Sequence, residues 1–160
     1  MTAGFLVDNY MREQTSRFQV TLENLERIGV FIAHFMTEAH LSDEQIHNFE
    51  LSVDEHFSNL VEHAFRRHPE EEIILTCRED PVKAQIIITD SSAGFDPRNY
   101  SIPDVEGKPI YELPPGGFGN YFMCELMDEV DYIHQPYVKN ELILTVYKNK
   151  DVPKNGFDSY

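Results

Sequence analysis

The stretch LSVDEHFSNLVEHAF, at residues 51–65, is the feature that most constrains the fold. Its apolar side chains recur at helical spacing and form one stripe, which consists of Val53, Phe57, Leu60, Val61 and Ala64. A helix with such a stripe must bury it against a second layer of structure. The opposite side is either a solvated surface or the floor of a site; it carries Glu55, Asn59, Glu62, His63 and Arg66.

The flanking sequence predicts the other elements. Ser42 is a suitable N-cap for this helix, and the step from His68 to Pro69 ends it near residue 67. Elsewhere we expect a strand over 16–22, a helix over 22–39, strands over 72–77 and 83–90, a long loop over 91–119, a helix over 118–127, and closing strands over 131–135 and 141–148. The loop is rich in proline and glycine, and loops of this length are usually functional.

This order of elements predicts an α+β fold. We expect a two-layer α/β sandwich, in which a mixed, mostly antiparallel sheet carries helices on one face. The expected domain covers residues 16–150, between a flexible N-terminus at 1–15 and a C-terminal tail at 151–160.

Composition narrows the classes of function. The chain has 160 residues, which is the size of one ordinary domain. Its net charge of −15 disfavours a surface that binds nucleic acid or an anionic membrane. A nucleotide is still compatible, because backbone amides can hold phosphates locally in an acidic protein. We expect Cys77 and Cys124 to be buried free thiols. Without a secretory signal or a long apolar run, the protein is expected to be soluble and cytoplasmic.

Two further segments carry residues suited to a ligand. In IIITDSSAGFDP, Asp90 ends a buried strand and is followed by small residues and Gly94, which is either a ligand-binding turn or an ordinary Asp-Ser-Ser turn. In PPGGFGNYF, Gly116, Gly117 and Gly119 lead into a helix, where free backbone amides could cradle a phosphate. This glycine cluster is neither a Walker A pattern nor a Rossmann fingerprint.

Together, these motifs resemble the N, G1 and G2 boxes of the histidine-kinase-like ATPase (Bergerat) fold. The resemblance covers residues 15–150. More specifically, the motifs resemble those of the bacterial anti-sigma factor serine/threonine-protein kinases of partner-switching pathways. This resemblance rests on motif residues in order and spacing, namely Glu55, Asn59 and His63, then Asp90, Gly94, Phe95 and Asp96, then Gly116, Gly117, Phe118, Gly119 and the LMDEV run at 126–130.

The resemblance implies a role for each position. Asn59 would coordinate Mg²⁺ through its amide oxygen, and Glu55 would act as the general base on the serine hydroxyl of a protein substrate. Asp90 would accept a hydrogen bond from the amino group of adenine, and Gly94 would make room for the ring. The polar side of the long helix would then be the floor of the site.

The remaining motif positions would surround the nucleotide. Gly116, Gly117 and Gly119 would fold over the triphosphate of ATP as part of a lid that opens and closes. Phe95 and Phe118 belong to the same boxes. For His63, a structural, hydrogen-bonded role beside the site is expected rather than catalysis.

Three positions depart from the family's pattern. Ser92 replaces the usual second glycine of the G1 box, which would stiffen the turn and crowd the adenine edge. A Gly-Thr pair that supports adenine binding is replaced by Lys139-Asn140-Glu141, with Thr145 as a weaker substitute. Pro114 and Pro115 stand where some relatives have a lid arginine, and the nearest cation is Lys108. These changes lower the expected nucleotide affinity and turnover.

Two functions follow from the resemblance. The first is an ATP-dependent serine kinase that sequesters a sigma factor and phosphorylates an anti-anti-sigma (STAS-type) partner. The second is a non-catalytic module of the same fold that binds such regulators with weak or no nucleotide turnover. A sensor histidine kinase is disfavoured, because the chain has no phospho-accepting helical hairpin before the domain. The family also implies a homodimer, and the acidic chain suits a partner with a basic face.

Overall fold

The computed structural model describes residues 12–100, 107 and 118–149. The elements are β1 (Arg12–Gln19), the 3₁₀ turn η1 (Leu22–Asn24), α1 (Leu25–Glu38), α2 (Asp43–Asn59), the π-helical turn η2 (Leu60–Ala64), β2 (Glu72–Glu79), β3 (Lys83–Asp90), α3 (Gly119–Leu126), β4 (Glu129–Ile133) and β5 (Asn140–Tyr147). The predicted C-terminal tail, most of the expected N-terminal segment and nearly all of 101–117 lie outside the described residues. The first strand starts at Arg12, four residues before its predicted start.

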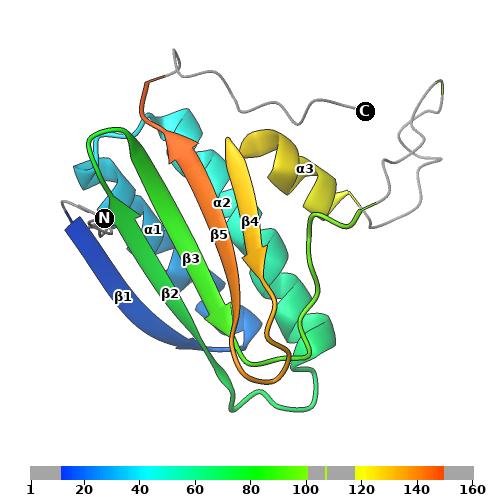
Figure 1. Ribbon diagram of the computed structural model, residues 1–160. Coiled ribbons are helices and arrows are strands. Elements are labelled where there is room, and N and C mark those ends of the chain that lie inside the picture. Colours follow the sequence, from blue (N-terminus) through cyan, green and yellow to red (C-terminus); the bar gives the residue numbers. More distant parts are fainter. Residues whose placement is uncertain (1–11, 101–106, 108–117, 150–160) are drawn as a thin grey trace, which may run out of the picture.

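The five described strands form one sheet in the order β1-β2-β3-β5-β4, and every neighbouring pair is antiparallel. Figure 1 shows α1 and α2 behind this sheet, with α3 beside α2. The predicted two-layer α+β fold is therefore confirmed, while the parallel pairing of a mixed sheet does not occur among the described strands. Within the same residues, no helix has the length and apolarity to cross a membrane.

The core lies between the sheet and the helices. Side chains alternate along each strand, so every second residue of β2, β3 and β5 points toward the helix layer. Each large apolar side chain that is fully buried there stabilises the fold by about 1.5–3 kcal/mol. The strands contribute Ile73, Leu75, Ile86, Ile88, Leu142 and Leu144, and the helices contribute Ile28, Ile32, Phe35, Phe49, Val53 and Phe57.

The start of α2 is capped as predicted. The Ser42 side chain accepts a hydrogen bond from the Gln45 backbone N–H at 3.2 Å, and the Gln45 side chain accepts one from the Ser42 N–H at 3.0 Å. Gln45 also donates to the carbonyl oxygen of Tyr147 at 2.9 Å. The cap thereby ties α2 to the end of β5.

The end of the same helix differs from the prediction. Instead of a regular helix to residue 67, the α-helix stops at Asn59 and continues as the π-helical turn η2. There the Phe65 N–H donates to the Leu60 carbonyl oxygen at 2.8 Å. The wider turn buries both Leu60 and Phe65, whereas a regular α-helix would place residues five apart on different faces.

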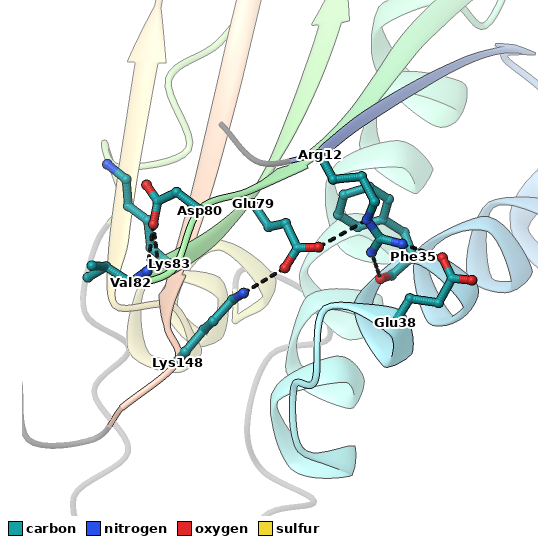
Figure 2. A network of polar contacts seen from close by, with 8 residues as sticks. All are labelled: Arg12, Phe35, Glu38, Glu79, Asp80, Val82, Lys83 and Lys148. Atoms are coloured by element: carbon teal, nitrogen blue, oxygen red, sulfur yellow. Dashed lines mark hydrogen bonds and ion pairs between the residues drawn. The ribbon is translucent and has the colours of Figure 1, made fainter. Parts of the chain in front are cut away.

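A network of charged groups fastens the first strand to the rest of the fold (Figure 2). Arg12 donates to the Phe35 carbonyl oxygen at 2.6 Å, near the end of α1, and is paired with Glu38. Glu79 is paired with Arg12 at 3.0 Å and accepts a hydrogen bond from Lys148 at 2.6 Å. One nearly buried carboxylate on β2 thus joins β1 to the residue that follows β5.

Candidate functional site

Glu55 and Asn59 lie one turn apart on α2, and both are half-buried. The Asn59 Nδ2 donates a hydrogen bond to Glu55 Oε1 at 3.1 Å. Because the amide nitrogen is used in this way, the Asn59 side-chain oxygen is the atom left to act as a ligand. The predicted pairing of a carboxylate and an amide on one side of this helix is present.

The first residue of α3 packs directly on Glu55. A Cβ built at Gly119 would lie 1.8 Å from Cδ of Glu55 and 1.9 Å from its Oε1, so only glycine fits here with Glu55 in place. Phe118, the N-cap residue of α3, provides no side-chain cap to the helix. Among the described residues, no side chain caps the first N–H groups of α3, which lie beside the Glu55 carboxylate, and a helix N-terminus of this kind favours anions.

Asp90 ends β3 and is buried. Its Oδ1 accepts three hydrogen bonds, from the Ser92 N–H at 2.9 Å, the Ser92 hydroxyl at 2.5 Å and the Asn140 side-chain amide at 3.2 Å. Among the described residues no hydrogen bond reaches Oδ2. The carboxylate is thus held firmly by one oxygen and has the other available for a ligand.

The two family departures beside Asp90 have structural roles. The Ser92 side-chain oxygen also accepts a hydrogen bond from the Gly94 N–H at 3.0 Å, so it shapes the turn. Asn140 is fully buried, donates to the Ser92 carbonyl oxygen at 2.8 Å and accepts from the Gln135 N–H at 3.1 Å. Together, Ser92 and Asn140 fix the orientation of Asp90, a role that the sequence did not indicate.

Gly94 is required by both its backbone and its neighbours. Its φ is +77°, and a Cβ there would lie 2.7 Å from the Tyr132 hydroxyl and 2.8 Å from Oδ1 of Asn140. The position that a side chain would occupy at Gly94 is therefore next to protein atoms. The Tyr132 hydroxyl oxygen accepts a hydrogen bond from the Phe95 N–H at 3.1 Å, and burial raises the pKa of Tyr132 to about 12.

His56 is a residue of this region that the sequence analysis missed. It is fully buried, its ring lies 5.4 Å from the Phe95 ring, and neither ring nitrogen has a hydrogen-bond partner among the described residues. Burial lowers the pKa of His56 to about 4, against the opposing effect of Asp90. The available signal was its spacing, because position 56 is three residues after Val53 and falls within the apolar stripe.

The remaining predicted site residues either lie away from Glu55, Asn59 and Asp90 or fall outside the described residues. Thr145 is buried on β5, where its hydroxyl oxygen accepts a hydrogen bond from Gln85 at 2.9 Å. It lies five residues, about 17 Å, along the strand from the Asn140 position that pairs with Asp90, and it points to the opposite face of the sheet. The structure therefore does not bring Thr145 to the site. His63 is exposed on η2, and Gly116 and Gly117 lie outside the described residues.

The donor set limits the kind of metal that could bind. Within residues 12–100, 107 and 118–149 there is no group of three or more His, Cys, Asp or Glu side chains that could hold a metal ion. Mg²⁺ does not need such a group, because it is usually bound by one or two protein oxygens together with substrate phosphates and water. The free side-chain oxygen of Asn59 fits that pattern.

Comparison with known proteins adds family relationships to this geometry. The family described as "Histidine kinase-like ATPase domain" matches residues 18–146. The serine-protein kinase RsbW of Staphylococcus epidermidis is 30% identical over 152 residues, with 91% of each chain covered. The serine-protein kinase RsbW of a Bacillus cereus strain is 26% identical over 129 residues, covering 73% of this chain and 77% of its own.

A solved structure shares the fold. The crystal structure of the RsbU and RsbW domains of Rv1364c from Mycobacterium tuberculosis superimposes with a TM-score of 0.59 at 12% identity. The match covers 84% of this chain and 31% of that longer chain, so the similarity spans about a third of the larger protein.

Proposed function

This chain belongs to the histidine kinase-like ATPase domain family, and from that premise we propose that it is an ATP-dependent protein serine kinase of a partner-switching pathway. In the cytoplasm it would hold a sigma factor and phosphorylate a small anti-anti-sigma protein on serine. The observation that carries the proposal is the Glu55–Asn59 pair, held one helical turn apart against the uncapped start of α3.

The residues at the site fit Mg-ATP. Ser92 and Asn140 hold Asp90 in position through Oδ1, and Oδ2, which no described residue hydrogen-bonds, would accept from the adenine amino group. The uncapped start of α3 would bind the triphosphate, and the Asn59 side-chain oxygen would hold Mg²⁺. When bound, ATP supplies the phosphoryl group and Mg²⁺ neutralises phosphate charge.

Two residues would act on the protein substrate. Glu55 would accept the proton of the attacking serine hydroxyl, which a positioned carboxylate can do within hydrogen-bond reach. The Nδ2 of Asn59, 3.1 Å from Glu55 Oε1, would keep that carboxylate in a fixed orientation. The phosphoserine product carries about −1.5 to −2 charges, and the net charge of this chain is −15, so repulsion would help to release the product.

A phosphotransfer assay tests this function. The parent protein, Mg-ATP labelled in the γ-phosphate, and a small anti-anti-sigma protein of the same cell are expected to give labelled phosphoserine. Glu55→Gln should abolish transfer and leave ATP binding intact, while Glu71→Gln, at an exposed loop position, serves as the matched control. Transfer by Glu55→Gln at the parental rate would show that Glu55 is not the base.

A non-catalytic binding module of the same fold is the second candidate. One observation favours it: a Cβ at Gly94, where the resemblance expects room for the adenine ring, would lie 2.7 Å from the Tyr132 hydroxyl and 2.8 Å from Oδ1 of Asn140. Calorimetric titration with Mg-ATP separates the candidates. Saturable binding supports the kinase, and no measurable binding by the parent supports the module.

A further inference from the structure

His56 is buried beside the proposed nucleotide site, yet nothing described so far uses it. It follows Glu55 on α2 and has no exposed surface. Both ring nitrogens lack a hydrogen-bond partner among the described residues, as does the hydroxyl of Ser52 one turn earlier on the same helix. Buried polar atoms without partners destabilise a folded protein, and native structures keep them mainly where a ligand or an ordered water completes the bonding.

The surroundings of His56 indicate what could complete it. Its ring lies 5.4 Å from that of Phe95, in the segment that follows Asp90. Asp90 raises the pKa of His56 and so opposes the effect of burial. Asp90 ends β3, and Figure 1 shows the chain running from there beside β4 toward α3. The carboxylate uses Oδ1 for its three hydrogen bonds, so Oδ2 and the His56 imidazole are both unengaged among the described residues.

The protonation state of His56 defines its hydrogen-bonding capacity. Burial lowers its pKa to about 4, so the ring is neutral near pH 7. A neutral imidazole has one N–H donor and one acceptor nitrogen. A carboxylate such as that of Asp90 accepts hydrogen bonds.

We propose that His56 is a base-recognition residue, which with Asp90 reads the edge of a purine and selects adenine over guanine. This inference rests on the proposed function, because it assigns the base end of the same nucleotide site. Adenine presents an amino donor next to a ring acceptor. The Asp90 carboxylate would accept from the amino group, and the His56 N–H, which has no exposed surface, would reach the ring acceptor through one buried water. Guanine presents a carbonyl oxygen in place of the amino group, so an acceptor would face the carboxylate.

The test compares affinities for Mg-ATP and Mg-GTP, measured by calorimetry on the full chain. His56→Leu removes both ring nitrogens and keeps an apolar side chain of similar volume. We expect its ATP-to-GTP affinity ratio to fall about tenfold or more, because ATP loses a hydrogen bond that GTP does not make. His47→Leu, at an exposed position of the same helix, is the control and should keep the parental ratio.

A second variant separates recognition from a purely structural role. His56→Gln retains a donor and an acceptor and should keep most of the preference for ATP. An unchanged ratio in His56→Leu, or equal losses for ATP and GTP in both variants, would overturn the proposal. Failure of the parent protein to bind either nucleotide would instead refute the proposed function itself.

Discussion

The contact between Gly119 and Glu55 gives the sharpest prediction about the proposed chemistry. In Gly119→Ala the new Cβ would lie 1.8 Å from Cδ of Glu55, roughly 2 Å closer than an ordinary carbon–carbon contact. The atoms that the new Cβ would meet are the carboxylate end of the flexible Glu55 side chain. The least costly response is therefore that this carboxylate moves away by roughly 2 Å and loses its hydrogen bond to Asn59.

This displacement of the Glu55 carboxylate determines the expected changes in phosphotransfer rate and in stability. Losing a positioned general base lowers a rate by about 10²–10⁴, which corresponds to roughly 3–5 kcal/mol in the activation free energy. The free energy of unfolding should fall by about 0.5–3 kcal/mol, because the lost charged hydrogen bond is worth about 1.5–3 kcal/mol and alanine returns at most about 1 kcal/mol over glycine in a helix. We therefore expect phosphotransfer to fall at least 100-fold, with a shift of a few °C in Tm.

The assay is phosphotransfer under saturating Mg-ATP, with Tm measured by circular dichroism. Gly29→Ala is the matched control, since nothing lies within 4 Å of a Cβ at this position of α1. It should retain full transfer and gain about 0.5–1 kcal/mol of stability. Transfer by Gly119→Ala within threefold of the parent would refute the reasoning that Glu55 must stay in its present position.

Three further predictions follow from the same contacts. Because the pKa of His56 is lowered from 6.5 to about 4 on folding, the unfolded state binds more protons than the folded state between these pH values. As pH falls from 6.5 to 4, the free energy of unfolding of the parent, measured by urea unfolding, should therefore fall by up to about 3 kcal/mol relative to His56→Leu. Asp90→Asn should weaken Mg-ATP binding at least about tenfold in calorimetry, because an amide can present its donor group to the adenine amino group; unchanged affinity would exclude Asp90 from the base site. Glu79→Gln should lower the free energy of unfolding by about 1–3 kcal/mol, because Arg12 and Lys148 lose their shared anion, whereas Glu13→Gln at an exposed position should leave the urea midpoint unchanged.

The elements were largely predictable from the sequence because their signals are local. Short apolar runs rich in isoleucine on either side of the Asp80-Pro81 turn identified β2 and β3, and Ser42 with its following residues defined the start of α2. The π-helical turn was not predictable in this way. It depends on burying Leu60 and Phe65 together, which is decided by packing against the rest of the fold rather than by helical periodicity.

The candidate site was predictable only where its residues interact along one element. Glu55 and Asn59 are four residues apart on a helix, so their contact follows from the spacing. Asn140 reaches Asp90 only through the pairing of β3 with β5, and without this pairing the sequence could not show that Thr145 lies on the face away from Asp90. His56 was missed although its spacing places it in the apolar stripe, whereas its contact with Phe95, which is distant in sequence, was not predictable.

The most direct measurement of the central claim is a crystal structure of the protein with Mg²⁺ and a non-hydrolysable ATP analogue. We expect the adenine amino group at Oδ2 of Asp90, Mg²⁺ at the side-chain oxygen of Asn59, and the triphosphate at the start of α3 beside Glu55. A nucleotide bound elsewhere, with Asn59 and Asp90 free of ligand contacts, would contradict this expectation.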